Sequence, residues 1–137
     1  WETLQEFCKH LDRFNLRLLV RPSKKNRKKL ARYAGVKGIE VIWGDLLNAN
    51  DVERAMQGSD YVLHLGGMVS PLADHHPQLT LKVNIGAAEN IVNAARKMPN
   101  SDELRVVYIG SVAMTAHRNE PVHWGRTGDP IMTGIFD

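Results

Sequence analysis

Residues 38–67 read GIEVIWGDLLNANDVERAMQGSDYVLHLGG, and this stretch decides the fold. Its apolar segments at 39–43 and 61–65, each followed by glycine, predict two strands. The polar segment between them predicts a short helix from about 50 to 57. A strand, a helix and a second strand in this order form the unit from which parallel sheets are built.

The ends of the predicted helix carry typical boundary residues. Asn50 or Asp51 can accept hydrogen bonds from the free N–H groups of the first turn, so we expect one of them to be the N-cap. Gly58 suits the left-handed position that often follows a last turn. The helix is therefore expected to be short and bounded on both sides.

The same alternation continues on both sides of this stretch. Apolar residues recur every three or four positions at 2–14 and at about 77–97, which is typical of amphipathic helices. Short apolar runs at 16–20 and 104–109 predict two further strands. A basic helix is expected at about 25–34. Helices and strands thus alternate along most of the chain.

This alternation predicts an α/β fold, a doubly wound parallel sheet with helices on both faces. The apolar runs are typical of parallel strands buried on both faces. From residue 112 onward no period survives, and residues 117–137 predict a long non-helical loop near the functional site. No linker or repeat divides the chain, so we expect residues 1–137 to belong to one domain.

The composition is typical of a globular protein. Of 137 residues, 43% are apolar and 24% are charged, which supports a packed core and argues against disorder. The single cysteine, Cys8, can form no internal disulfide, so we expect a reducing, cytoplasmic location. No signal peptide or membrane-spanning run is recognisable, and we expect no membrane partner.

Positive charge is concentrated in one segment. Residues 21–32 contain seven Lys and Arg and no acid, although the net charge of the whole chain is +3. Proteins that bind nucleic acid usually spread basic residues over a face, so a small anionic ligand is favoured and no nucleic-acid partner is expected. The adjacent His75 and His76 lack the spacing of helical metal ligands, and we expect no metal site.

Ligands of open α/β sheets bind outside the carboxyl ends of the strands. At those ends, cations can hold a phosphate, an acid can accept from an exocyclic amine, and glycines allow a ligand to approach the backbone. The candidates are Arg21, Ser23 and Lys24 after the first strand, Asp45 and Leu46 after the second, Leu65, Gly66 and Gly67 after the third, and Ser111 after the fourth. The same residue types occur in ordinary turns and caps, so the residues alone leave both roles open.

Four segments together resemble a known family. They are VRP at 20–22, the stretch at 38–67, VNIGAAENIVNAA at 83–95 and LRVVYIGSVAM at 104–114. Their order and spacing resemble the extended short-chain dehydrogenase/reductase family, of the NAD(P)-dependent epimerase/dehydratase type, over nearly the whole chain. The resemblance implies a partial NAD(P)-binding Rossmann domain. For the intact protein it implies an NAD(P)-dependent oxidoreductase or a sugar-nucleotide epimerase or dehydratase.

The resemblance also implies which residues bind the cofactor. Arg21 stands where an acid selects NAD in other members of the family. Together with Ser23 and Lys24, it implies a site for the 2′-phosphate of NADP, with NAD as the alternative. Asp45 and Leu46 match the pair that lies against the adenine.

Further roles follow from the same resemblance. Residues 65–67 match the segment that runs beside the ribose and pyrophosphate. Asn84 matches an asparagine that braces the end of the active-site strand. Ser111 matches the catalytic serine, which hydrogen-bonds the reacting oxygen. A shift of one residue would place Val112 at that position instead.

Two signatures of the family are missing from the sequence. The strand and G-x-x-G-x-x-G loop of the family would precede Trp1, and its Tyr-x-x-x-Lys motif would begin within a few residues of Asp137. We therefore expect an interior segment of a longer enzyme, inactive by itself.

The implied substrate is a small molecule, with a nucleotide sugar among the candidates. The oligomeric state stays open, with a homodimer among the alternatives. The rival hypothesis is a non-catalytic module that senses NADP or binds a partner protein. The Tyr-x-x-x-Lys motif separates the two, because its presence in the full-length protein supports the enzyme.

Overall fold

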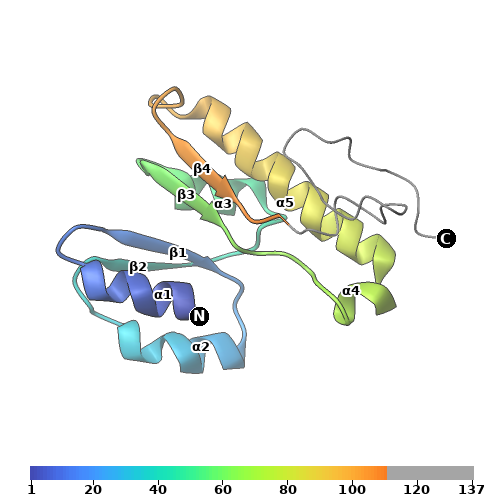
Figure 1. Cartoon of the computed structure of the whole chain (residues 1–137), viewed down its shortest axis with the longest axis horizontal. Coiled ribbons are helices and arrows are strands. Elements are labelled where there is room, and N and C mark those ends of the chain that lie inside the picture. Colours follow the sequence, from blue (N-terminus) through green and yellow to red (C-terminus); the bar gives the residue numbers. More distant parts are fainter. Residues whose placement is uncertain (111–137) are drawn as a thin grey trace, which may run out of the picture.

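The computed structural model describes residues 1–110, in which helices and strands alternate (Figure 1). The elements are α1 (Glu2–Phe7), the 3-10 helix η1 (Cys8–His10), β1 (Leu16–Val20), α2 (Lys24–Leu30), the 3-10 helix η2 (Ala31–Tyr33), β2 (Ile39–Trp43), α3 (Ala49–Met56), β3 (Tyr61–His64), α4 (Leu72–His75), α5 (Pro77–Lys97) and β4 (Arg105–Tyr108). Ser111 and the predicted loop at 117–137 lie outside the described residues. No helix in the described part is both long enough and apolar enough to cross a membrane.

The first helix is shorter than the predicted 2–14. Its α-helical part ends at Phe7, and η1 and a turn follow, in which Arg13 and Phe14 both donate N–H groups to His10 O at 3.0 Å. The rings of Phe7 and Phe14 still meet edge to face, with centroids 5.4 Å apart. Apolar spacing therefore predicted which side chains meet, but not how the backbone between them is bonded. The predicted basic helix likewise divides into α2 and η2.

The central helix begins at Ala49, and its N-cap is Asn48 rather than Asn50 or Asp51. Asn48 Oδ1 accepts the N–H groups of Asn50 at 3.0 Å and Asp51 at 3.3 Å. All three side chains have the chemistry of a cap, so their type alone did not identify the residue used. Gly58 has the predicted left-handed conformation, with a φ of 71°.

The four strands form two parallel pairs, β1–β2 and β3–β4. Leu16 pairs with Ile39 in the first ladder, and Tyr61 pairs with Arg105 in the second. In Figure 1, β1 and β3 are the inner strands, and all four strands point in the same direction, toward the right of the view. Within residues 1–110 no ladder joins β1 to β3. The sequence predicted one sheet, because alternating elements indicate the direction of the strands but not their neighbours.

A core between α3, α5 and the inner strands connects the two pairs. Its buried members are Val52, Met56, Ile91, Ala94, Met98 and Leu104, and Leu19 of β1 and Val62 of β3 pack against them. Figure 1 shows α1 and α2 on the side of β1–β2 that faces away from α3 and α5. Helices therefore flank both faces of β1–β2, as the fold class predicted.

The strand β4 is not buried, although its apolar run predicted cover on both faces. All four of its residues are exposed, with Val107 at 46%. Within residues 1–110 its one neighbour in the sheet is β3. The apolar side chains of β4 are typical of a strand that is buried on both faces, but the described part of the chain buries them only in part.

Candidate functional site

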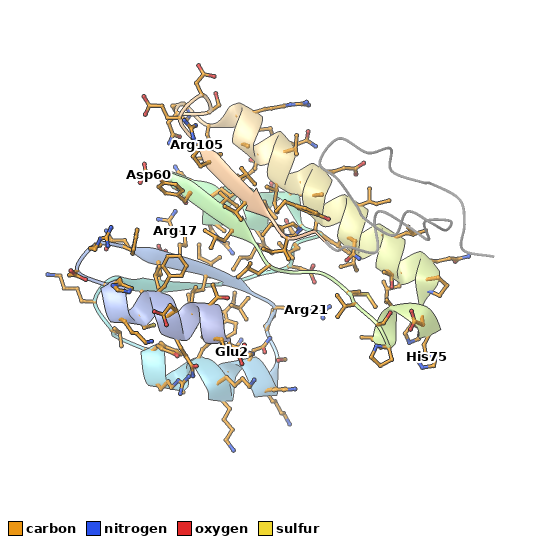
Figure 2. The ribbon with its side chains drawn as sticks, viewed as in Figure 1. Glu2, Arg17, Arg21, Asp60, His75 and Arg105 are labelled. Carbon is orange, nitrogen blue, oxygen red and sulfur yellow. The ribbon has the colours of Figure 1, made fainter. Side chains whose placement is uncertain are left out.

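The segments that follow β1, β2 and β3 lie at the end of the strands toward which the strands point. Figure 2 shows Arg21 at this end, and Asp60 and Arg105 at the opposite end of the strands. Parallel strands have this consequence, because their carboxyl ends meet at one rim of the sheet. The candidate residues after the first three strands therefore share a rim.

The turn between β1 and α2 exposes Arg21, Ser23 and Lys24. Ser23 is the N-cap of α2, and its Oγ accepts the N–H of Asn26 at 3.0 Å. Asn26 Nδ2 in turn donates to Arg21 O at 2.8 Å. The side chains of Arg21 and Lys24 form no ion pair with any residue between 1 and 110. The turn thus has a fixed backbone and presents two cations to solvent.

Other cations of the basic segment lie against aromatic rings. The cation lies 4.6 Å from the ring centroid for Arg27 on Trp43, 4.7 Å for Lys29 on Trp1 and 4.8 Å for Arg32 on Tyr33. Such contacts contribute about 0.5–1 kcal/mol at exposed sites. These pairings were not predicted, because two of the rings are distant from the basic segment in sequence.

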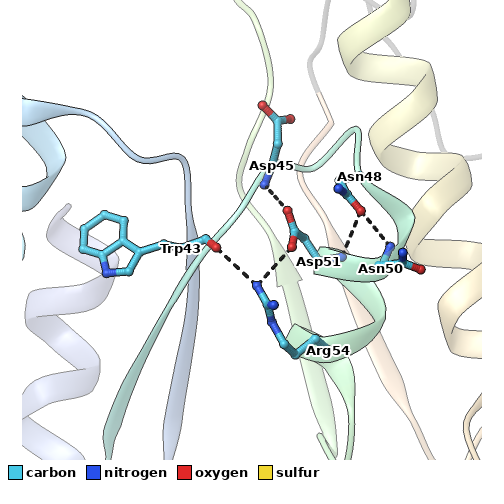
Figure 3. A network of polar contacts seen from close by, with 6 residues as sticks. All are labelled: Trp43, Asp45, Asn48, Asn50, Asp51 and Arg54. Carbon is cyan, nitrogen blue, oxygen red and sulfur yellow. Dashed lines mark hydrogen bonds and ion pairs between the residues drawn. The ribbon is translucent and has the colours of Figure 1, made fainter.

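A polar network holds loop 44–47 after β2 (Figure 3). Asp51 Oδ2 accepts the N–H of Asp45 at 3.0 Å, and Asp45 Oδ1 accepts the N–H of Leu47 at 2.9 Å. Arg54 Nη2 donates to Asp51 Oδ1 at 3.0 Å and to a backbone carbonyl of β2 at 3.2 Å. Asp45 is half-buried, and these bonds leave its Oδ2 able to accept from a ligand amine.

Leu46 brings the loops after β2 and β3 into contact. A Cβ on Gly66 would lie 2.6 Å from Leu46 Cδ1, so a larger residue would have to displace Leu46. At Gly67 a Cβ would lie 3.1 Å from Asn84 Oδ1. Residues 65–67 are exposed, which leaves their backbone open to a ligand. The pair predicted after β2 and the glycines predicted after β3 are therefore neighbours.

Asn84 of α5 braces the loop after β3 with both atoms of its amide. Its Oδ1 accepts the N–H of Met68 at 2.8 Å, and its Nδ2 donates to Met68 O at 3.0 Å. Two bonds to one residue fix the backbone directly after the glycines. The family resemblance implies that Asn84 braces the end of the active-site strand. That strand end contains Ser111, which lies outside the described residues.

Two residues that the sequence did not identify also hold loop 44–47. One is Asp51, which had been expected as a helix cap, and the other is Asn90, whose Nδ2 donates to Leu46 O at 2.8 Å. A signal for Asn90 was present: it lies three residues after Ala87 and four before Ala94, both of which are buried. Helical spacing thus places a polar side chain at the edge of the apolar face of α5, where it needs a partner.

Neither the predicted catalytic residue, Ser111, nor its alternative, Val112, belongs to the described residues. Within residues 1–110, no group of three or more His, Cys, Asp or Glu is arranged to hold a metal ion. The described part of the candidate site consists of the turn with Arg21 and Lys24, loop 44–47 with Asp45, and the glycine-containing segment 65–67. Their chemistry suits a phosphate, an amine and a closely approaching sugar.

Comparison with known proteins identifies the family of the chain. Residues 5–130 match the NAD dependent epimerase/dehydratase family. The 3 beta-hydroxysteroid dehydrogenase type 7 of Mus musculus is 34% identical over 61 residues, which are 44% of this chain and 16% of that protein. The UDP-glucose 4-epimerase of Rickettsia bellii is 36% identical over 58 residues, which are 42% of this chain and 17% of that protein. The match thus spans about a sixth of the length of these relatives.

A solved structure supports the fold. The X-ray structure of Pen from Bacillus thuringiensis superposes with a TM-score of 0.51 at 24% identity, over 56% of this chain and 24% of that one. The family match covers most of the chain, and the alternating helices and parallel strand pairs agree with it. The chain therefore belongs to the NAD dependent epimerase/dehydratase family.

Proposed function

We propose that the full-length protein is an NAD(P)-dependent oxidoreductase or a sugar-nucleotide epimerase or dehydratase, in which the described residues hold the adenosine half of the cofactor. The observation that carries the proposal is the contact between Leu46 and Gly66. It brings the acid of loop 44–47 beside the exposed backbone of residues 65–67. With Arg21 on the same rim, these groups correspond to the amine, sugar and phosphate of an adenosine nucleotide.

The residues present fit such a ligand. Asp45 Oδ2 can accept from the exocyclic amine of adenine, and Leu46 offers apolar surface next to it. Residues 66–67 lack side chains where the ribose and pyrophosphate would approach. Arg21 and Lys24 can bind a 2′-phosphate, since a guanidinium and an ammonium both donate to phosphate oxygens. We therefore propose NADP as the preferred cofactor.

The family supports a proposal for the chemistry of the intact protein. When bound, the nicotinamide supplies hydride transfer to or from a carbon that bears a hydroxyl or carbonyl oxygen. We propose that Ser111 donates a hydrogen bond to that oxygen. The relatives are named for UDP-glucose and for a 3 beta-hydroxysteroid, so the proposed substrate is a small hydroxylated molecule of one of these classes.

Calorimetric titration of the full-length protein with NADPH and NADH tests the cofactor. We expect NADPH to bind at least about tenfold more tightly, and Arg21→Asp to abolish or reverse this preference. Lys28→Asp is the matched control, since it changes an exposed cation of the neighbouring α2 and should leave the preference intact. All titrations use one salt concentration, because salt screens exposed charges. Equal affinities would contradict the NADP assignment, and no binding of either nucleotide would contradict the proposed function.

Turnover separates an enzyme from an NADP sensor. We expect the full-length protein to convert UDP-glucose or a 3 beta-hydroxysteroid. Ser111→Ala should lower kcat by about a hundredfold or more with little change in cofactor affinity, because it removes one donor to the reacting oxygen. Cofactor binding without turnover of either substrate class would favour the non-catalytic alternative.

A further inference from the structure

We propose that Asp51 and Asn90 are positioning residues of the nucleotide site, which hold loop 44–47 from two helices and thereby fix Asp45 and Leu46. The inference rests on the proposed function, because it concerns the same site. These two side chains would not themselves contact the ligand, but they would fix the positions of the residues that do.

Asp51 holds the first half of the loop from α3. Its Oδ2 accepts the N–H of Asp45 at 3.0 Å, and its Oδ1 pairs with Arg54 at 3.0 Å, so both carboxylate oxygens have a donor. Its side chain is 20% exposed. A Cβ on Gly44 would lie 2.6 Å from Asp51 Cγ, so the carboxylate occupies the space that the glycine leaves. The loop and α3 are thus fitted closely to each other.

Asn90 holds the second half of the loop from α5. Its Nδ2 donates to Leu46 O at 2.8 Å. Gly86, about one turn earlier on the same helix, leaves room for Leu47, because a Cβ there would lie 3.0 Å from Leu47 Cδ2. The helix therefore contacts two successive residues of the loop. Asn84 of the same helix braces the loop after β3, so α5 sets the spacing between the two loops.

The two contacts act on the peptide groups on either side of the Asp45–Leu46 peptide. Asp51 binds the N–H of Asp45, and Asn90 binds the C=O of Leu46. Holding the backbone at both points orients the Asp45 carboxylate and keeps Leu46 against Gly66. A site fixed in this way before ligand arrives does not spend binding free energy on ordering the loop. Loss of either contact should therefore weaken binding of the adenosine half.

Substitutions in the full-length protein test this assignment, with NADPH, 5′-AMP and nicotinamide mononucleotide as probes. Asn90→Leu should weaken NADPH and 5′-AMP about tenfold each and leave nicotinamide mononucleotide unchanged, because a bonded carbonyl loses its donor. Asn93→Leu, an exposed position on the same helix, is the matched control and should change none of the three. A general loss of stability would instead affect all three probes.

Asp51 provides the rescue test. Asp51→Leu should show the same pattern as Asn90→Leu, whereas Asp51→Asn keeps an acceptor oxygen for the Asp45 N–H and should retain most of the affinity. Hydrogen exchange without nucleotide should show the Asp45 and Leu47 amides exchanging faster in both Leu variants. If Asn90→Leu does not fold, Asn90→Ser, whose side chain is too short to reach Leu46 O, replaces it with the same expected results.

The outcomes distinguish the two claims. A wild-type protein that binds neither NADPH nor 5′-AMP overturns the proposed function, and the assignment with it. A wild-type protein that binds both, together with Leu variants of unchanged affinity and exchange, overturns the positioning role alone. Equal losses for all three probes would also overturn that role, since they would indicate a general effect on the fold.

Discussion

The two strand pairs differ in how well the described chain covers them. In β1 and β2 most residues are half-buried, whereas β4 is exposed throughout. The strand sequences do not explain this difference, since Val-Val-Tyr in β4 is as apolar as much of β1. The positions of the helices explain it, because Figure 1 shows helices on both sides of β1–β2, but α3 and α5 on one side of β3–β4.

The register of the second pair identifies its uncovered face. Leu63 is the partner of Val107, and Tyr61 lies two residues before Leu63, so all three share a face. Their exposed fractions are 38%, 46% and 64%, respectively. Val62 and His64 point to the other face, toward the core. The comparison teaches that the apolarity of a strand indicates the cover it requires, not the cover that a given length of chain supplies.

The largest expected effect is on amide hydrogen exchange at the edges where the two strand pairs face each other. In a parallel strand, successive N–H groups point to opposite edges. Leu16 donates to Gly38 O on the side of β2, so Arg17 and Leu19 direct their N–H groups to the other edge, toward β3. Within residues 1–110 no strand pairs with this edge. In the described part of the chain, the halves are therefore joined by side chains and not by a ladder.

The family resemblance implies a strand ahead of α1, and handedness predicts where it lies. α1 and α2 lie on one side of β1–β2 (Figure 1), and α2 leads outward from β1 to β2. Right-handed crossovers then place a strand before α1 at the inner edge of β1. In the full-length protein we expect the Arg17 and Leu19 amides to exchange at least about a thousandfold more slowly than an unbonded amide.

Hydrogen exchange measured by NMR tests this arrangement. The Lys37 amide, in an exposed turn, serves as the unprotected reference, and the Leu18 amide, which points toward β2, serves as the protected one. Exchange of Arg17 and Leu19 at the rate of Lys37, while Leu18 stays protected, would show that the inner edge of β1 is open. The two halves would then be separate ladders in the intact protein as well.

The shared core provides the next largest effect. Ile91 is 5% exposed and belongs to the cluster against which Leu19 and Val62 pack, so it contributes to both halves. We expect Ile91→Ala to lower the free energy of unfolding by about 2–5 kcal/mol in urea titrations, because it leaves a cavity. Val92→Ala is the control, since Val92 is 47% exposed, and should cost less than about 1 kcal/mol. Destabilisation confined to the amides of β3 would contradict a core common to both halves.

Local sequence patterns predicted the helices and strands of this fold better than the way in which these elements are arranged around one another. The bounds of α5 follow from apolar positions that recur over 21 residues. The four-residue helix α4 was missed, because so few residues show no period. The separation of the strands into two pairs was also missed, since it depends on where the crossovers pass and not on any single segment.

The candidate residues could be chosen from the sequence as predictions, but the contacts between them could not. Position after a strand placed Asp45 and Gly66 on one rim, yet the contact that joins their loops required the fold. Ser23 shows a second limit, since a hydroxyl that caps a helix and one that binds phosphate have the same local pattern. Asp51 and Asn90 act on backbone atoms, which residue spacing does not reveal.

The smallest expected effect comes from His64, a buried residue in the less covered half. His64 is 6% exposed, its ring lies 5.4 Å from that of Tyr108, and burial lowers the pKa of the imidazole from its ordinary value of 6.5. Below that value the unfolded chain binds a proton that the folded protein does not, so the free energy of unfolding falls as the pH drops. His64→Phe removes the titrating group and keeps a ring beside Tyr108. Urea titrations between about pH 8 and pH 5 should therefore show the wild type losing stability relative to the variant below about pH 6.5 and no change in their difference above about pH 7.5. Parallel curves across the whole range would show that the burial of His64 does not affect its protonation.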